Sequence, residues 1–67
     1  MMAYRQFDLR SDDHRLTCWL ESDARLRPGV LVTLKGDLDE RHWEIVRASQ
    51  MQLADPPEKR WRVGGLL

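Results

Sequence analysis

Apolar residues in this sequence come in short alternating runs, separated by segments rich in turn-forming residues. The clearest run is residues 30–35, VLVTLK, in which alternate apolar side chains fall on one face of an extended chain. A polar segment, residues 36–41, follows it, and residues 42–48, HWEIVRA, alternate again. This pattern predicts an antiparallel hairpin joined by the polar segment. Its predicted core residues are Val30, Val32, Leu34, Trp43 and Ile45.

Local signals mark the ends of this hairpin. Pro28–Gly29 fits a type II turn, because proline sets φ at the second position and glycine accepts a positive φ at the third. Within the return strand the apolar phase changes at Ile45–Val46, which predicts a bend or bulge. Upstream, residues 22–26 could form one helical turn capped by Ser22, with Leu26 inserted into the core.

Shorter segments on either side of the hairpin also have strand character. Two consecutive prolines in residues 54–59, ADPPEK, break any strand there, because proline cannot donate a ladder hydrogen bond. Residues 64–67, GGLL, could form a flexible C-terminal tail. The additional predicted strands are residues 3–9, 15–20, 49–53 and 60–63.

These segments predict an all-β fold. Five or six short antiparallel strands, with turns every 8 to 12 residues, are typical of a small barrel or sandwich. A chain of 67 residues is too short for a full sandwich, so we expect one domain over residues 1–67. The architecture that fits best is a strongly bent SH3-like barrel, and an OB-like barrel is the alternative.

The composition restricts the expected ligands and the expected cellular location. Basic and acidic residues balance at eleven each, which argues against a protein dedicated to gripping a phosphate backbone. A single cysteine, Cys18, cannot form an intramolecular disulfide, and no apolar run approaches the roughly 20 residues that span a bilayer. The N-terminal segment lacks the apolar region of a signal peptide. We therefore expect a cytoplasmic protein that does not bind membranes.

The sequence contains cysteine, histidine and acidic residues, but not in the spacings typical of metal sites or catalytic sites. Cys18, His14 and His42 lack the paired spacing of a zinc site, so no metal is expected. Cys18 shares its strand face with apolar neighbours, which predicts a buried and inert thiol. The acids of the hairpin loop are typical of solvated turn residues. We expect no catalytic residue and no cofactor, and hence no enzyme.

Two resemblances extend this interpretation. The segment LRPGVLVTLKGD, followed by a tryptophan-bearing strand, resembles the central hairpin of SH3-like barrels, including KOW-type and Tudor-type modules. Over most of the chain, the segments TCWLESDARLRPGVLVTLK, RHWEIV and PPEKRWRVGGL are similar to short uncharacterised proteins encoded by bacteriophages and prophages. The resemblance implies a phage or prophage setting, with the bacterial host cytoplasm as the location, and it transfers no activity or binding residue.

The expected function is a small interaction or adaptor module that binds a protein partner or forms a homodimer. Unpaired sheet edges are templates for strand addition, and the C-terminal segment RWRVGGLL could pair with a partner or a second copy. A single-stranded nucleic-acid binder, stacking bases on the same aromatic and arginine surface, is the alternative. Trp19 is either a packing residue or an exposed aromatic. The candidate partner-binding residues are Trp19, Arg60, Trp61 and Arg62.

Overall fold

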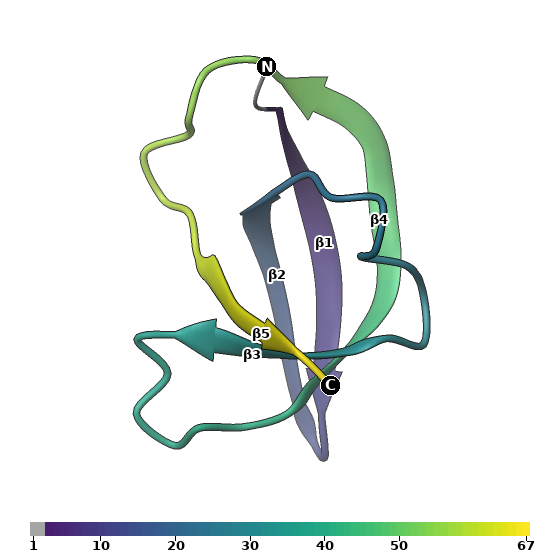
Figure 1. Cartoon of the computed structure of the whole chain (residues 1–67), viewed down its shortest axis with the longest axis vertical. Helices are drawn as coiled ribbons and strands as arrows, with labels where there is room; N and C mark the ends of the chain where they lie inside the picture. Colours follow the sequence, from purple (N-terminus) through teal and green to yellow (C-terminus); the bar gives the residue numbers. More distant parts are fainter. Residues whose placement is uncertain (1–2) are drawn as a thin grey trace.

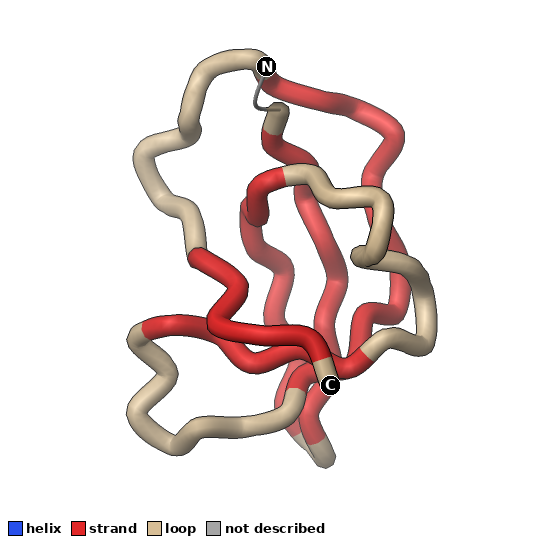
Figure 2. The backbone as a smooth tube through the Cα atoms, in the orientation of Figure 1, coloured by secondary structure: helices blue, strands red, loops and turns tan. Residues whose placement is uncertain are grey.

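The computed structural model describes residues 3–67, which form five antiparallel strands in one open sheet (Figures 1 and 2). Within these residues there is no helix, and so none that could cross a membrane. The predicted all-β class is confirmed. The strands are β1 (Tyr4–Ser11), β2 (His14–Glu21), β3 (Leu31–Lys35), β4 (Trp43–Leu53) and β5 (Arg62–Leu66).

The long strand β4 connects the two halves of the sheet. The strand order is β2-β1-β4-β3-β5, so β4 pairs with β1 along one edge and with β3 along the other. Against β1 its register steps from Ile45 to Arg47, which leaves Val46 as the extra residue of a bulge. This confirms the bend predicted at Ile45–Val46. β3, which pairs with β4 before the bulge, and β5 run across the layer formed by β1 and β2 (Figure 1).

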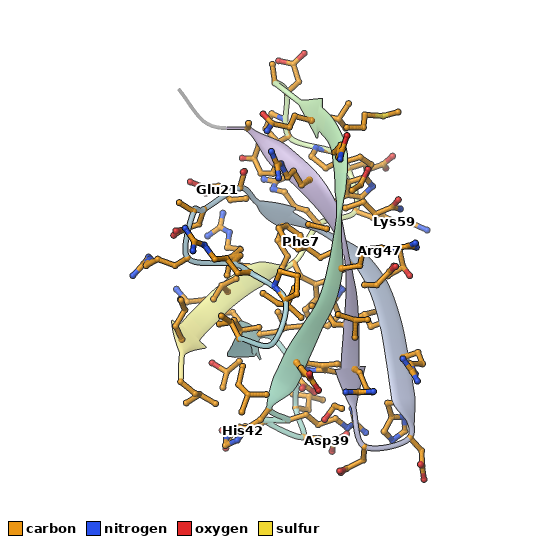
Figure 3. All side chains as sticks on the ribbon, turned by 90° about the vertical axis from the view of Figure 1, so that its right-hand side faces the viewer. Phe7, Glu21, Asp39, His42, Arg47 and Lys59 are labelled. Atoms are coloured by element: carbon orange, nitrogen blue, oxygen red, sulfur yellow. The ribbon has the colours of Figure 1, made fainter. Side chains whose placement is uncertain are left out.

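The core lies between these two crossing layers. Figure 3 shows Phe7 on the side of the β1–β4 layer that faces β3 and β5, and Arg47 on the opposite side. Of the predicted hairpin core, all members are buried except Val30, which is half-buried and packs against the cluster. The buried cluster consists of Phe7, Leu9, Cys18, Leu20, Leu26, Val32, Leu34, Trp43 and Ile45.

Two predicted strand boundaries were wrong. Residues 49–53 are not a separate strand but the second half of β4, because they continue the pairing with β1 through a further register shift. The last strand was predicted over residues 60–63, whereas β5 begins at Arg62 and extends to Leu66. Gly65 and Leu66 are thus paired with β3, with Gly64 at a register shift, rather than forming a free tail. Glycine is a poor strand former, so the Gly64–Gly65 pair favoured the tail interpretation.

The loop between β2 and β3 has the predicted turn at its end but no helical turn. Gly29 has a φ of 93°, and the Val30 N–H donates to the Arg27 carbonyl at 3.0 Å, as a type II turn requires. At the start of the loop the carboxylate of Asp23, rather than Ser22, accepts a backbone hydrogen bond, from the Arg25 N–H at 2.9 Å. This turn replaces the expected helical one.

The loop between β3 and β4 is held by one carboxylate. Asp37 accepts hydrogen bonds from the buried Trp43 indole Nε1–H at 3.0 Å, and from the backbone N–H groups of Arg41 at 3.0 Å and Asp39 at 3.2 Å. Because these donors stabilise the charged form, chiefly through Trp43, the pKa of Asp37 lies below its ordinary value of 3.8. The side chain is only 8% exposed.

Replacing Asp37 should destabilise the protein more than replacing its neighbour Asp39. Asp37→Ala leaves the indole N–H of Trp43 without its acceptor, and a buried donor without a partner is costly. Asp39→Ala removes a 66% exposed carboxylate that pairs with Arg41 at the surface. Thermal unfolding followed by circular dichroism should show a melting temperature lower by several degrees for Asp37→Ala and little changed for Asp39→Ala.

The comparison of the native protein with Asp37→Ala gives a pH test. A carboxyl whose pKa is lowered by folding stabilises the protein above its unfolded pKa, and that stabilisation is lost as the pH falls through the folded pKa. Below about pH 3.8 the melting temperature of the native protein should therefore approach that of Asp37→Ala. A constant difference between the two down to pH 2 would contradict the role assigned to the Asp37 carboxylate.

Candidate functional site

The two edge strands of the sheet meet at one point and then separate. β2 and β5 lie at opposite ends of the strand order, yet the Trp61 N–H donates to the Trp19 carbonyl at 2.9 Å. Beyond this bond a groove of about 780 Å³ opens between β5 and the loop that follows β2. Its lining comprises Tyr4, Glu21, Asp23, Arg25, Leu26, Lys35, Arg60, Trp61, Arg62, Val63, Gly64, Gly65 and Leu66.

One wall of the groove is the outer side of β5. β3 occupies the inner side, and the Leu67 N–H donates across it to the Leu31 carbonyl at 2.9 Å. Backbone groups alternate in direction along an antiparallel strand, so the Leu66 N–H points away from β3. Gly64 and Gly65 add no side chains to this wall. The groove is therefore bordered by strand backbone that another extended chain can approach.

Gly64 has a packing reason for being glycine. The register between β3 and β5 shifts beside it, and a Cβ at this position would lie 2.9 Å from Oγ1 of Thr33. A real Cβ does not come so close, so a side chain at residue 64 would require Thr33 to rotate its side chain or β5 to shift away from β3. The close contact with β3 thus disfavours a side chain at residue 64, whereas a Cβ on Gly65 would lie at an ordinary 3.8 Å from Oγ1 of Thr33.

The basic residues of the groove differ from those on the outer face of the sheet. On that face Arg10 pairs with Glu44 at 2.6 Å, and Arg47 pairs with Asp8 at 2.8 Å. In the groove Arg25 is likewise held by Asp23 at 2.8 Å. By contrast, three groove cations have no carboxylate partner among residues 3–67, namely Lys35, Arg60 and Arg62.

Arg60 is positioned by an aromatic ring and a carbonyl. Its guanidinium carbon lies 6.0 Å from the centroid of the Tyr4 ring, and its Nη1 donates to the Pro57 carbonyl at 3.0 Å. Tyr4 itself is buried in the fold, with 6% of its surface exposed. The cation–π contact places Arg60 at the end of the groove where β1 begins.

Of the four predicted partner-binding residues, three line the groove. Arg60 and Arg62 are exposed, and Trp61 is half-buried because it packs against the core. Trp19 does not line the groove; its half-buried side chain belongs to the face of β2 opposite Cys18. The two tryptophans are therefore neighbours through their backbones and do not form one aromatic surface.

Sequence reasoning missed Lys35 as a groove residue. Lys35 ends β3 and lies directly opposite Arg62 in the β3–β5 pairing. Its connection to the groove depends on residues that are far apart in the chain being paired, and no local pattern indicates that pairing. The only available signal was its position at the end of the clearest strand, next to Gly36.

The thiol of Cys18 is buried, as predicted. Burial raises its pKa to about 12, with the negative charge of Asp8 contributing, so the thiol stays protonated at neutral pH. Both histidines, His14 and His42, are exposed. Among the described residues no three side chains of the metal-binding types lie close enough together to hold an ion.

Cys18 should react slowly with a thiol reagent in the folded protein. The reacting species is the thiolate, which burial suppresses while also blocking access. With dithionitrobenzoate at pH 8, we expect the native rate to be at least about a hundredfold below the rate in guanidinium chloride. Similar rates in the two conditions would contradict the assigned burial.

Comparison of the chain with known protein families, with curated proteins and with solved structures finds no match.

Proposed function

We propose that this protein is a non-catalytic interaction module that binds an extended segment of a partner protein in the groove beside β5. The observation that carries the proposal is the outer edge of β5, whose backbone borders the groove and has no strand paired to it among residues 3–67. Main-chain hydrogen bonds along such an edge supply affinity for a polypeptide, and flanking side chains supply specificity.

The groove has further features that suit a peptide. Apolar surface from Trp61, Leu26 and Leu66 lies within it, next to the cations of β5 and β3. Extended peptides place alternate side chains on opposite sides, so one side could contact apolar surface while the other meets charge. An added strand would also lengthen the sheet at the edge where β5 now ends it.

A single-stranded nucleic acid is the second candidate ligand. The clustered cations and Trp61 favour it, because backbone phosphates and stacked bases need those partners. Against it, Trp19 lies outside the groove, which leaves the half-buried Trp61 as the tryptophan of the groove lining. A protein partner fits better, since a polypeptide backbone presents donors and acceptors at the same spacing as the free edge of β5.

The proposal includes an SH3-like barrel of phage or prophage origin that acts in the bacterial cytoplasm. A strongly bent five-stranded sheet, with β2 and β5 meeting at the Trp19–Trp61 bond, supports the barrel. The proposed origin rests on the resemblance of the segments TCWLESDARLRPGVLVTLK, RHWEIV and PPEKRWRVGGL to short phage proteins, and on nothing else. A lone cysteine that is buried and free is compatible with a reducing compartment.

Blocking the edge of β5 should abolish peptide binding. Random peptides long enough to span β5 can be displayed and selected against the immobilised protein. Leu66→Pro removes the outward N–H and places a ring in its path, whereas the control Leu66→Ala keeps the N–H and loses only side-chain contact. We expect selected peptides to bind Leu66→Pro about tenfold more weakly than Leu66→Ala.

The circular dichroism spectra of both variants should match that of the native protein, because proline is tolerated on an edge strand where the N–H faces outward. Failure to select any peptide, or equal binding by the two folded variants, would count against strand addition.

A single-stranded oligonucleotide should not bind in the groove. Titration of oligothymidylate at low salt should leave tryptophan fluorescence unquenched, because bases have only the partly buried Trp61 to stack on. Quenching that disappears as salt is added would instead favour the nucleic-acid candidate.

A further inference from the structure

We infer that the partner segment is acidic, with a carboxylate seated between Lys35 and Arg62; this inference rests on the function proposed above. These two residues are direct partners in the antiparallel pairing of β3 with β5. Like charges directly opposite each other on neighbouring strands repel and destabilise the pair. No carboxylate among residues 3–67 pairs with either one.

The position of Lys35 brings its charge to the edge strand. A Cβ placed on Gly64 would lie 3.6 Å from Cγ of Lys35, so the lysine side chain passes beside the bare backbone of β5. Arg62 comes from β5 itself and is exposed. An extended segment added along β5 therefore runs past both cations within the reach of its side chains.

A negatively charged partner group would relieve the repulsion that the fold leaves in place. Charge-assisted hydrogen bonds between arginine or lysine and a carboxylate are stronger than neutral ones. Arg60, held near Tyr4, supplies a third positive charge along the groove. Because successive residues of a strand alternate in direction, the acids are expected at every second position of the bound segment.

The same charges argue against a second copy of this chain as the occupant. Pairing two copies through β5 would be two-fold symmetric and would bring the same cationic edge to both sides of the interface. The groove also holds Glu21 and the Asp23–Arg25 ion pair on its far wall. Asp23 is paired with Arg25, so Glu21 is the acid of this wall that has no ion-pair partner among residues 3–67, and it disfavours an acidic side chain on that side of the groove.

The test uses three capped peptides of equal length. In the first, glutamate alternates with valine and threonine; the second has glutamine and the third has lysine in place of each glutamate. Binding is measured by fluorescence anisotropy at low salt. We expect the glutamate peptide to bind about tenfold more tightly than the glutamine peptide, with the lysine peptide weakest and the difference reduced by added salt.

Two charge-removing variants locate the effect. Arg62→Gln should remove most of the preference for glutamate over glutamine, whereas Lys59→Gln should keep it. Lys59 is exposed, lies outside the groove lining and stands on the Arg47 side of the molecule in Figure 3. Arg62→Gln should also leave the melting temperature unchanged or slightly raised, because it removes repulsion from Lys35. Binding and stability should thus move in opposite directions.

The outcomes separate this inference from the proposed function. Equal binding of the glutamate and glutamine peptides, weakened in both cases by Leu66→Pro, would overturn the acidic preference and leave strand addition standing. If no peptide binds and the selection above also fails, both are overturned. A homodimer in sedimentation that Leu66→Pro dissociates, or an oligonucleotide bound through Arg62 in place of the peptides, would likewise overturn the inference.

Discussion

The bulge at Val46 lets one strand serve two neighbours that run in different directions. Before the bulge, Glu44 lies opposite both Arg10 of β1 and Leu31 of β3, so β4 is paired on both edges. After it, β4 follows β1 alone. The extra residue increases the local twist, which carries β3 across the β1–β2 layer and brings β5 with it. The burial of Phe7 and Ile45 between the layers depends on that crossing.

Much of this fold follows from local patterns. The alternation in residues 30–35, the Pro28–Gly29 turn and the phase change at Ile45–Val46 each rest on neighbouring residues, and each was predicted correctly. The extent of β5 was not, because its glycines join the sheet only through contact with Thr33 on a strand about thirty residues earlier. Such long-range pairing overrides local propensity.

The residues of the candidate site likewise fall into those that local sequence indicated and those that only the structure shows. Arg60, Trp61 and Arg62 adjoin one another in the sequence, so a local cluster indicated three of the groove residues. The exclusion of Trp19 and the inclusion of Lys35 both depend on which strands lie side by side. The discrimination between paired and unpaired arginines likewise needs the structure, since Arg47 finds its carboxylate 39 positions away, at Asp8.

The close approach of Gly64 to Thr33 limits which residues of the groove can be substituted during evolution. Since a side chain at residue 64 would force Thr33 or β5 to move, the part of β5 that would hold a partner's backbone has less freedom to vary. Lys35 and Arg62, in contrast, sit at exposed ends of strands where substitution is easily accommodated. Affinity would therefore come from the backbone of β5 and selectivity from these charged side chains. A new partner preference could be acquired by changing the charges while the backbone hydrogen bonds stayed the same.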